Sequence, residues 1–179
     1  LGLPKWLRAL SATFSATILV GQLIAHGVPA GLAEWLDREC RLPVRVARDG
    51  QQATAGAVYL APDNVHLLCK RNGGNYLLKT NSNGGGQICP AAVVLFRSVA
   101  ECCGPRAIGV ILTGMGCDGA AGLKDMLAAG AYTIAQDEAS SVIFGMPKAA
   151  ISIGAVSEVV AVDRVGQRLV SLLTVSKSC

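Results

Sequence analysis

The feature that most constrains the fold of this chain is a regular alternation of short apolar runs with helical patterns in its second half. Helices are predicted over residues 92–103, 120–129, 147–153 and 163–173, the last capped by Asp163, and strands over residues 108–113, 131–136 and 156–162. Strands and helices that alternate at this spacing form βαβ units with parallel strands and right-handed crossovers. The pattern therefore predicts an α/β fold with a mainly parallel sheet.

The first half of the chain also contains predicted strands and a helix, but they alternate less regularly. Residues 17–22 form an apolar run typical of a strand covered on both faces, and residues 28–40 have helical spacing. Residues 58–61 and 65–69 flank Pro62-Asp63-Asn64, a turn signature, so we expect a β-hairpin there. A further short strand is predicted over residues 76–79, and the stretch 81–86 is expected to be a loop.

Composition excludes several classes of protein. The chain has 179 residues, of which 51% are hydrophobic and 16% charged, and such a composition is incompatible with a disordered chain. The longest apolar candidate, residues 16–25, is interrupted by Gly21 and Gln22, so we expect no membrane span. The net charge of +4 is mild and the basic residues are dispersed, which argues against nucleic-acid binding. Residues 1–10 do not resemble a signal peptide, so a cytoplasmic location is expected.

The cysteines indicate neither disulfides nor a metal site. Seven are present, an odd number without C-x-x-C spacing: Cys40, Cys69, Cys89, Cys102, Cys103, Cys117 and Cys179. The two histidines, His26 and His66, lie near no suitable cluster in the sequence. Free thiols in a reducing compartment are the simplest interpretation, and no cofactor or metal ion is expected.

One glycine-rich turn is the strongest candidate for a functional loop. Thr113-Gly-Met-Gly-Cys-Asp-Gly119 joins a predicted buried strand to a helix. Ligands of parallel sheets bind at the carboxyl ends of the strands, which here are residues 22–27, 113–119 and 136–141. Asp118 is either an N-cap of the following helix or part of a site at this edge. The loop lacks the Lys-Ser/Thr of a P-loop.

Three longer blocks resemble a known family. Residues 109–123, 129–140 and 144–150, together with Asp49-Gly50, Tyr59-Leu-Ala-Pro62 and Leu95-Phe-Arg-Ser-Val99, closely resemble the catalytic domain of the chemotaxis protein-glutamate methylesterases. The resemblance implies a doubly wound, mainly parallel sheet flanked by helices, with a β-hairpin insertion. It also implies hydrolysis of glutamyl methyl esters, and in some members deamidation of glutamine, on the cytoplasmic helices of chemoreceptors.

The chemistry that the resemblance implies is a Ser-His-Asp triad. The triad aspartate falls on Asp118, where it would hold the imidazole's tautomer and stabilise the imidazolium. The backbone N–H of Met115 falls where the family contributes to the oxyanion hole. Both assignments rest on the matching loop motif.

The other two triad members do not match. An alignment on Gln22, Gly27 and Ala33-Glu34 places Leu23 at the position of the histidine. His26 is a candidate substitute base, but it lies about 10 Å further along an extended chain, so the loop would have to change its register. The family serine would fall just before Leu1, and Ser11 and Ser15 do not match its motif.

Polar groups are also lost next to the site. Where the family has Pro-Ser-Val-Asp before a helix, this chain has Pro90-Ala91-Ala92-Val93. Cys117, an alternative nucleophile beside Asp118, has no identifiable base, and a loop-filling role is the simpler interpretation.

Two functions therefore remain open. We expect residues 1–179 to form a single methylesterase-like domain, with the start of the family domain before residue 1 and without a receiver domain. The first function is a methylesterase with impaired or absent activity, acting on a methylated chemoreceptor or a similar helical signalling protein. The resemblance adds a phosphoacceptor domain, in cis or in trans, as a candidate partner, but gating of the site by it is not inferred. The second is a non-catalytic relative that binds a receptor or signalling partner.

Overall fold

The computed structural model describes residues 3–22, 27–82 and 89–176. The elements in chain order are α1 (Leu3–Arg8), β1 (Ile18–Val20), α2 (Val28–Glu39), β2 (Val44–Val46), β3 (Val58–Leu60), β4 (His66–Asn72), β5 (Asn75–Asn81), α3 (Ala92–Cys103), β6 (Ile108–Ile111), α4 (Ala120–Ala128), β7 (Tyr132–Gln136), α5 (Met146–Ser152), β8 (Glu158–Val160) and α6 (Val165–Ser176). Two short 3₁₀ turns, Gly104–Arg106 and Val162–Arg164, precede β6 and α6.

Within the described residues, the strands form two parallel sheets and one antiparallel hairpin. The first sheet has the order β1-β3-β2 and the second the order β6-β7-β8, each with three parallel strands. Ile18 and Val44 both lie opposite Val58 in the first sheet, and Ile108 lies opposite Tyr132 in the second. The α/β class with parallel sheets predicted from the alternation of strands and helices is therefore confirmed.

The hairpin lies at a different place from the one predicted. β3 does not pair with β4; it is the central strand of the first sheet, and all three of its residues are buried. The hairpin is instead β4-β5, with Asn72 opposite Asn75 across Gly73-Gly74. Pro62-Asp63-Asn64 does form a turn, with Asn64 at φ 56°. Turn residues indicate where the chain changes direction, but burial on both faces is what places β3 inside a parallel sheet.

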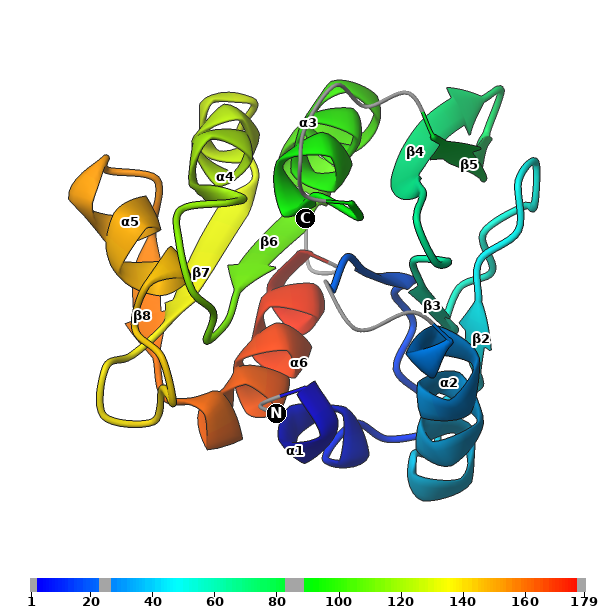
Figure 1. Cartoon of the computed structure of the whole chain (residues 1–179), viewed down its shortest axis with the longest axis horizontal. Helices are drawn as coiled ribbons and strands as arrows, with labels where there is room; N and C mark the ends of the chain where they lie inside the picture. The colour runs from blue at the N-terminus through cyan, green and yellow to red at the C-terminus, as the bar shows by residue number, and fades with distance from the viewer. Residues whose placement is uncertain (1–2, 23–26, 83–88, 177–179) are drawn as a thin grey trace.

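Helices cover the strands from two sides. Figure 1 shows α3 and α4 on one side and α1, α2 and α6 on the other. The larger core cluster joins α1, α2 and α6 to strands of both sheets, with Leu7, Leu36, Val58 and Ile134 fully buried. A second cluster joins α3, α4 and α5 to the β6-β7-β8 sheet, and a third lies between α3, β3 and the hairpin.

Element boundaries in the second half follow the sequence closely. α3 covers the predicted residues, and α4 ends one residue early before Gly130, which has a φ of 92°. Asp163 does not cap the last helix, because it lies inside the 3₁₀ turn Val162–Arg164, where no side chain caps the backbone. β2 is a three-residue strand that the pattern did not predict.

Among the described residues, no helix is both long enough and apolar enough to cross a membrane.

Candidate active site at the carboxyl edge of the second sheet

The loop that carries Asp118 follows the carboxyl end of a parallel strand. β6 ends at Ile111, α4 begins at Ala120, and the glycine-rich turn lies between them. This is the edge at which ligands of parallel sheets bind, so the predicted position of Asp118 is confirmed. The side chain of Asp118 is half-buried.

Asp118 caps a helix, but not the one that follows it. Its Oδ2 accepts a hydrogen bond from the N–H of Ala92 at 2.8 Å, and its Oδ1 accepts one from Val93 at 3.1 Å. Both N–H groups belong to the first turn of α3, where they have no partner within the helix. The N-cap position of α4 is Gly119, with φ 87° and no side-chain hydrogen bond. The prediction that Asp118 caps α4 was therefore wrong, because tertiary packing presents the carboxylate to a different helix.

A second distant side chain binds the same helix start. Nδ1 of His66, a buried residue at the start of β4, accepts a hydrogen bond from the N–H of Ala91 at 3.1 Å. Because Nδ1 accepts, a neutral His66 carries its proton on Nε2. Ala91, Ala92 and Val93 offer no capping side chain of their own, so His66 and Asp118 supply it from elsewhere in the chain. Nothing in the sequence around His66 indicated this role.

Close helix packing explains why the Asp118 loop reaches α3. A Cβ atom on Gly119 would lie 3.1 Å from the Cβ of Ala92, and one on Gly122 would lie 2.9 Å from the carbonyl oxygen of Val93. These two positions therefore require glycine, which lets α4 approach the first turn of α3 closely. The close approach places the Asp118 loop where its carboxylate binds the first turn of α3.

The other side of the loop is held by the segment that follows β7. Gly114 donates to the carbonyl of Ile143 at 3.0 Å and accepts from the N–H of Met146 at 2.8 Å. The buried Gln136 anchors the loop start, since its Oε1 accepts from the N–H of Thr113 at 2.8 Å. The loops after β6 and β7 therefore form one connected edge.

Met115 stands out from the surface at the tip of this loop. Its side chain is 82% exposed, and its backbone N–H has no hydrogen-bond partner among the described residues. Gly116 follows with φ 86°, a conformation that favours glycine. The loop thus combines a carboxylate with an open N–H group, which are two of the components that acyl-transfer sites use.

Two of the predicted site positions cannot be placed. Leu23 and His26 both lie outside the described residues. Cys117 is exposed beside Asp118, and the imidazole of His66 is buried against the start of α3. The structure therefore brings together Asp118 and the Met115 loop and leaves the base unassigned.

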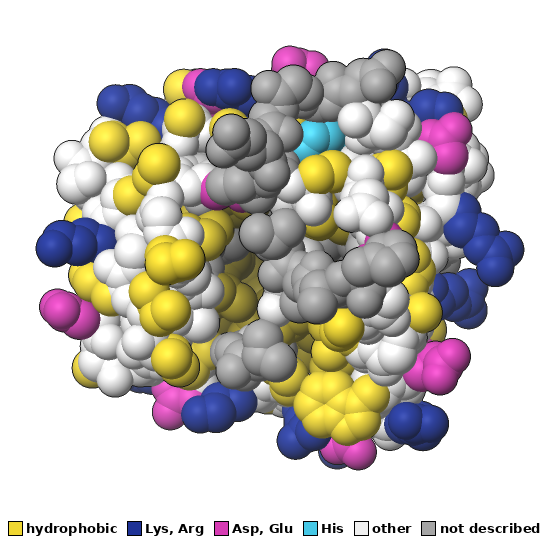
Figure 2. All heavy atoms as spheres, in the orientation of Figure 1, with side chains coloured by type: hydrophobic (Ala, Val, Ile, Leu, Met, Phe, Trp, Pro, Cys, Tyr) yellow, Lys and Arg dark blue, Asp and Glu magenta, His cyan; other side chains and the backbone are white. Residues whose placement is uncertain are grey.

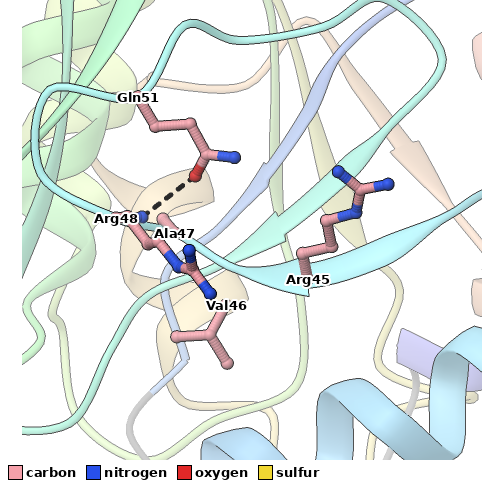
Figure 3. A pocket seen from close by; sticks show the side chains of 5 residues that line it. All are labelled: Arg45, Val46, Ala47, Arg48 and Gln51. Atoms are coloured by element: carbon pink, nitrogen blue, oxygen red, sulfur yellow. Dashed lines mark hydrogen bonds between the residues drawn. The ribbon is translucent and has the colours of Figure 1, made fainter.

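A separate pocket of about 440 Å³ lies at the carboxyl end of β2. Figure 3 shows that Gln51 reaches back to the backbone of Arg48, with its Oε1 accepting from that N–H at 3.1 Å. The lining residues are Arg45, Val46, Ala47, Arg48 and Gln51. Since β2 is the edge strand of the other sheet, this pocket is not part of the Asp118 loop.

Comparison with known proteins identifies the family. The model of the CheB methylesterase family matches residues 2–169 of this chain. The chain belongs to the CheB methylesterase family. A protein-glutamate methylesterase/protein-glutamine glutaminase of Burkholderia lata is 48% identical over 172 residues, covering 96% of this chain and 50% of that protein. One from Nitrosomonas europaea is 46% identical over 157 residues, covering 87% of this chain and 44% of that protein.

The fold agrees with the family. The CheB methylesterase catalytic domain of Thermotoga maritima superposes with a TM-score of 0.93 at 32% identity, over 96% of this chain and 91% of that one. The chain thus spans about half the length of the curated relatives it matches but nearly all of a CheB catalytic domain. The resemblance drawn from the sequence motifs is confirmed.

Proposed function

We propose that this chain is a CheB-type domain that recognises glutamyl methyl esters on chemoreceptor helices and hydrolyses them slowly or not at all. One alignment carries the proposal: matched on Gln22, Gly27 and Ala33-Glu34, the chain has Leu23 at the position where the resemblance places the catalytic histidine. Leucine has no group that can accept the proton of a hydroxyl nucleophile. We include glutamine side chains as a second substrate class, because the relatives are also named protein-glutamine glutaminases.

The Asp118 loop retains two groups of the proposed ester-binding site, although the catalytic base is missing. In this proposal Asp118 occupies the acid position of the triad and Met115 offers its N–H to the oxyanion. Asp118 also binds two N–H groups of α3, so its carboxylate has a structural role that does not depend on an imidazole partner. A carboxylate oxygen accepts more than one hydrogen bond, so an imidazole could still be bound. The site therefore persists as a structure even when the base is absent.

The expected rate follows from the energetics of serine triads. Removing the nucleophile or the base costs up to about 10⁶-fold in turnover, and the oxyanion hole alone retains about 10³-fold over water. Asp118 is not assigned as a replacement base, because in the triad geometry its carboxylate faces the imidazole and not the hydroxyl of the nucleophile. We therefore place the activity far below that of relatives with a complete triad.

The decisive assay is methanol release from methylated receptor cytoplasmic fragments. We expect Leu23→His to raise turnover by about 10³-fold or more where the upstream serine is present. Leu23→Met, which changes the side chain without adding a base, and His26→Ala are the controls and should leave the rate unchanged. A parent rate near that of triad-bearing relatives, abolished by His26→Ala, would show that His26 serves as the base and refute the proposal.

A non-catalytic binding role is the second candidate, and exposed apolar side chains favour it. Met115 and Val142 are each 82% exposed, and Ile143 is also exposed. The Gly114–Ile143 backbone hydrogen bond joins the two loops that carry these side chains. Figure 2 shows apolar side chains at many places on one face of the molecule, with Lys and Arg mainly around its periphery. Such a surface suits the apolar stripe of a helical partner.

Binding is measured separately from turnover by calorimetry with the same receptor fragments. If the domain binds receptor helices at this edge, Val142→Asp should weaken binding by tenfold or more. Val175→Asp is the matched control, since Val175 is an exposed valine that belongs to α6 and not to the loops after β6 and β7. Equal losses in both variants would contradict docking at the Asp118 edge. The functional partner would then be sought among phosphoacceptor domains.

A further inference from the structure

Three cysteines that are distant in the sequence come together away from the Asp118 loop. Cys69 lies in β4, and Cys102 and Cys103 are the last two residues of α3. Their three sulfur atoms all lie within 4.8 Å of one another, and the Cys102 and Cys103 sulfurs are 3.3 Å apart. Cys69 is buried, whereas the other two are half-buried and reachable from solvent.

The fold fixes the register of this cluster. Ser98, one turn before Cys102 on α3, accepts a hydrogen bond from the N–H of Cys69 at 3.0 Å and donates to the carbonyl of Leu95 at 2.8 Å. This buried bridge fixes the position of α3 relative to β4 next to the three sulfur atoms. The cluster is therefore built by the packing of a helix against a strand.

The spacing of the sulfurs suits a metal ion better than a disulfide. A three-coordinate ion with metal–sulfur bonds of about 2.3 Å places its sulfurs about 4 Å apart. Cys102 and Cys103 are adjacent in the chain, so their Cα atoms are about 3.8 Å apart, shorter than the usual disulfide range of about 4.4–6.8 Å. The closest pair of sulfurs is thus the pair least able to form a disulfide.

Polar and cationic groups stand beside the cluster. The hydroxyl of Tyr76 and the guanidinium of Arg106 both interact with the Cys103 thiol. Arg106 lies over the Tyr76 ring, 5.8 Å from its centroid, on the same side of the hairpin. A cationic side chain therefore stands beside the group that a soft metal ion needs as a thiolate.

We propose that Cys69, Cys102 and Cys103 form a binding site for one thiophilic d¹⁰ cation, with Cu(I) preferred. Soft thiolate ligands select such ions, and three thiolates complete the coordination of Cu(I). Structural Zn²⁺ sites need four ligands, and no fourth His, Cys, Asp or Glu joins this cluster among the described residues. The site lies at the C-terminal end of α3, a helix about 18 Å long whose first turn binds Asp118. It is therefore independent of the esterase chemistry.

The test is an anaerobic Cu(I) titration against a chromophoric Cu(I) chelator, with a phosphine reductant that keeps all thiols reduced. The parent should bind one equivalent, and a variant that keeps only the cluster (Cys40→Ser, Cys89→Ser, Cys117→Ser, Cys179→Ser) should bind it with the same affinity. Cys69→Ser alone should weaken binding by a hundredfold or more. X-ray absorption of the loaded cluster-only variant should report three sulfur neighbours.

Other outcomes overturn the proposal. Loss of binding in the cluster-only variant, or full binding by Cys69→Ser, would place Cu(I) on other cysteines. Zn²⁺ binding with no Cu(I) uptake would contradict three-coordination. A disulfide between Cys69 and Cys102 or Cys103 that persists under the reductant would show that these thiols pair with each other. Circular dichroism of each metal-free variant establishes that it is folded, so a loss of binding cannot be attributed to unfolding.

Discussion

At the level of single residues, Asp118 and His66 together bind three successive backbone N–H groups, His66 that of Ala91 and Asp118 those of Ala92 and Val93. Both satisfy N–H groups at the start of α3, from positions 25 or 26 residues away in the chain. Unpaired N–H groups at a helix start are costly when water cannot reach them, and a carboxylate there also interacts favourably with the helix dipole. These two side chains therefore stabilise the domain whatever its catalytic activity.

Asp118→Ala should lower the free energy of unfolding by about 1–2 kcal/mol, because two N–H groups of α3 lose their acceptor. Asp118→Asn should lower it less, since one acceptor oxygen remains. Urea unfolding followed by circular dichroism measures both. Asp163→Ala is the control: Asp163 is exposed and makes no capping hydrogen bond, so the change should be within about 0.5 kcal/mol. Equal stability of Asp118→Ala and the parent would contradict the trans cap.

His66→Leu should destabilise the domain by about 1–3 kcal/mol, because the N–H of Ala91 becomes buried without an acceptor. His66→Asn can place its Oδ1 near the position of Nδ1, so it should recover part of this loss. The same unfolding experiment compares the two variants. The opposite ranking, with leucine the more stable, would show that apolar packing outweighs the hydrogen bond at this site.

At the level of elements, glycines set the distance between α3 and α4. Gly122→Ala would normally favour a helix, since alanine is preferred over glycine by about 1 kcal/mol. Here the added Cβ would lie 2.9 Å from both the Cβ of Phe96 and the carbonyl oxygen of Val93, which are not free to move. We expect a net loss of about 1–3 kcal/mol in thermal or urea unfolding.

Gly31→Ala provides a matched control in another helix. Gly31 lies in α2, is exposed, and has no atom within 4 Å of an added Cβ. The same substitution should therefore stabilise the domain by up to about 1 kcal/mol. If both variants changed stability in the same direction, helix propensity and not the α3–α4 contact would dominate.

A polar cluster attaches α6 to the second sheet. Glu158 in β8 accepts from Arg168 of α6 at 2.6 Å and from the hydroxyl of Tyr132 in β7 at 2.8 Å. The hydrogen bond from Arg168 lowers the pKa of Glu158, more strongly than burial raises it. Because the pKa is lower in the folded protein, the stabilisation is present above the ordinary glutamate value of 4.5 and is lost as the pH falls below it.

Glu158→Gln should therefore reduce stability most near neutral pH and progressively less as the pH falls below 4.5. Urea unfolding of parent and variant across this pH range measures the difference. Raising the salt concentration at pH 7 should shrink it, because both partners are partly exposed and screened. A difference that does not vary with pH would show that side-chain packing, and not charge, is lost in the variant.

At the level of the whole molecule, one core connects the two sheets. Val58 and Leu60 of the first sheet and Ile134 and Val160 of the second belong to the same buried cluster as Trp6 of α1. A shared core couples the unfolding of the parts that line it. Three-stranded sheets that share such a core behave as one cooperative unit.

We expect urea unfolding to be a single transition. In a Trp35→Phe variant, which removes the more exposed of the two tryptophans, fluorescence reports Trp6 in the shared core. Its midpoint should coincide with that of far-ultraviolet circular dichroism, which reports helices on both sides of the strands. Separate midpoints would indicate that the two sheets unfold independently.

The sequence by itself determined the α/β class, the boundaries of most helices and the family. The helix over residues 92–103 and the strand that leads into the Asp118 loop follow from local hydrophobic periodicity, which neighbouring residues alone produce. The glycine-rich motif and the blocks around it are also local, so the resemblance to the family follows from the order of the residues alone.

Only the tertiary structure decided which distant groups meet. The partner strand of β3, the helix that Asp118 caps, the role of His66 and the gathering of Cys69 with Cys102 and Cys103 all depend on contacts between segments 14 to about 40 residues apart. Turn and cap signals state what a residue can bond to, but not which element packing will bring to it. The same aspartate could cap either of two helices, and the close approach of α4 to α3 selected one of them.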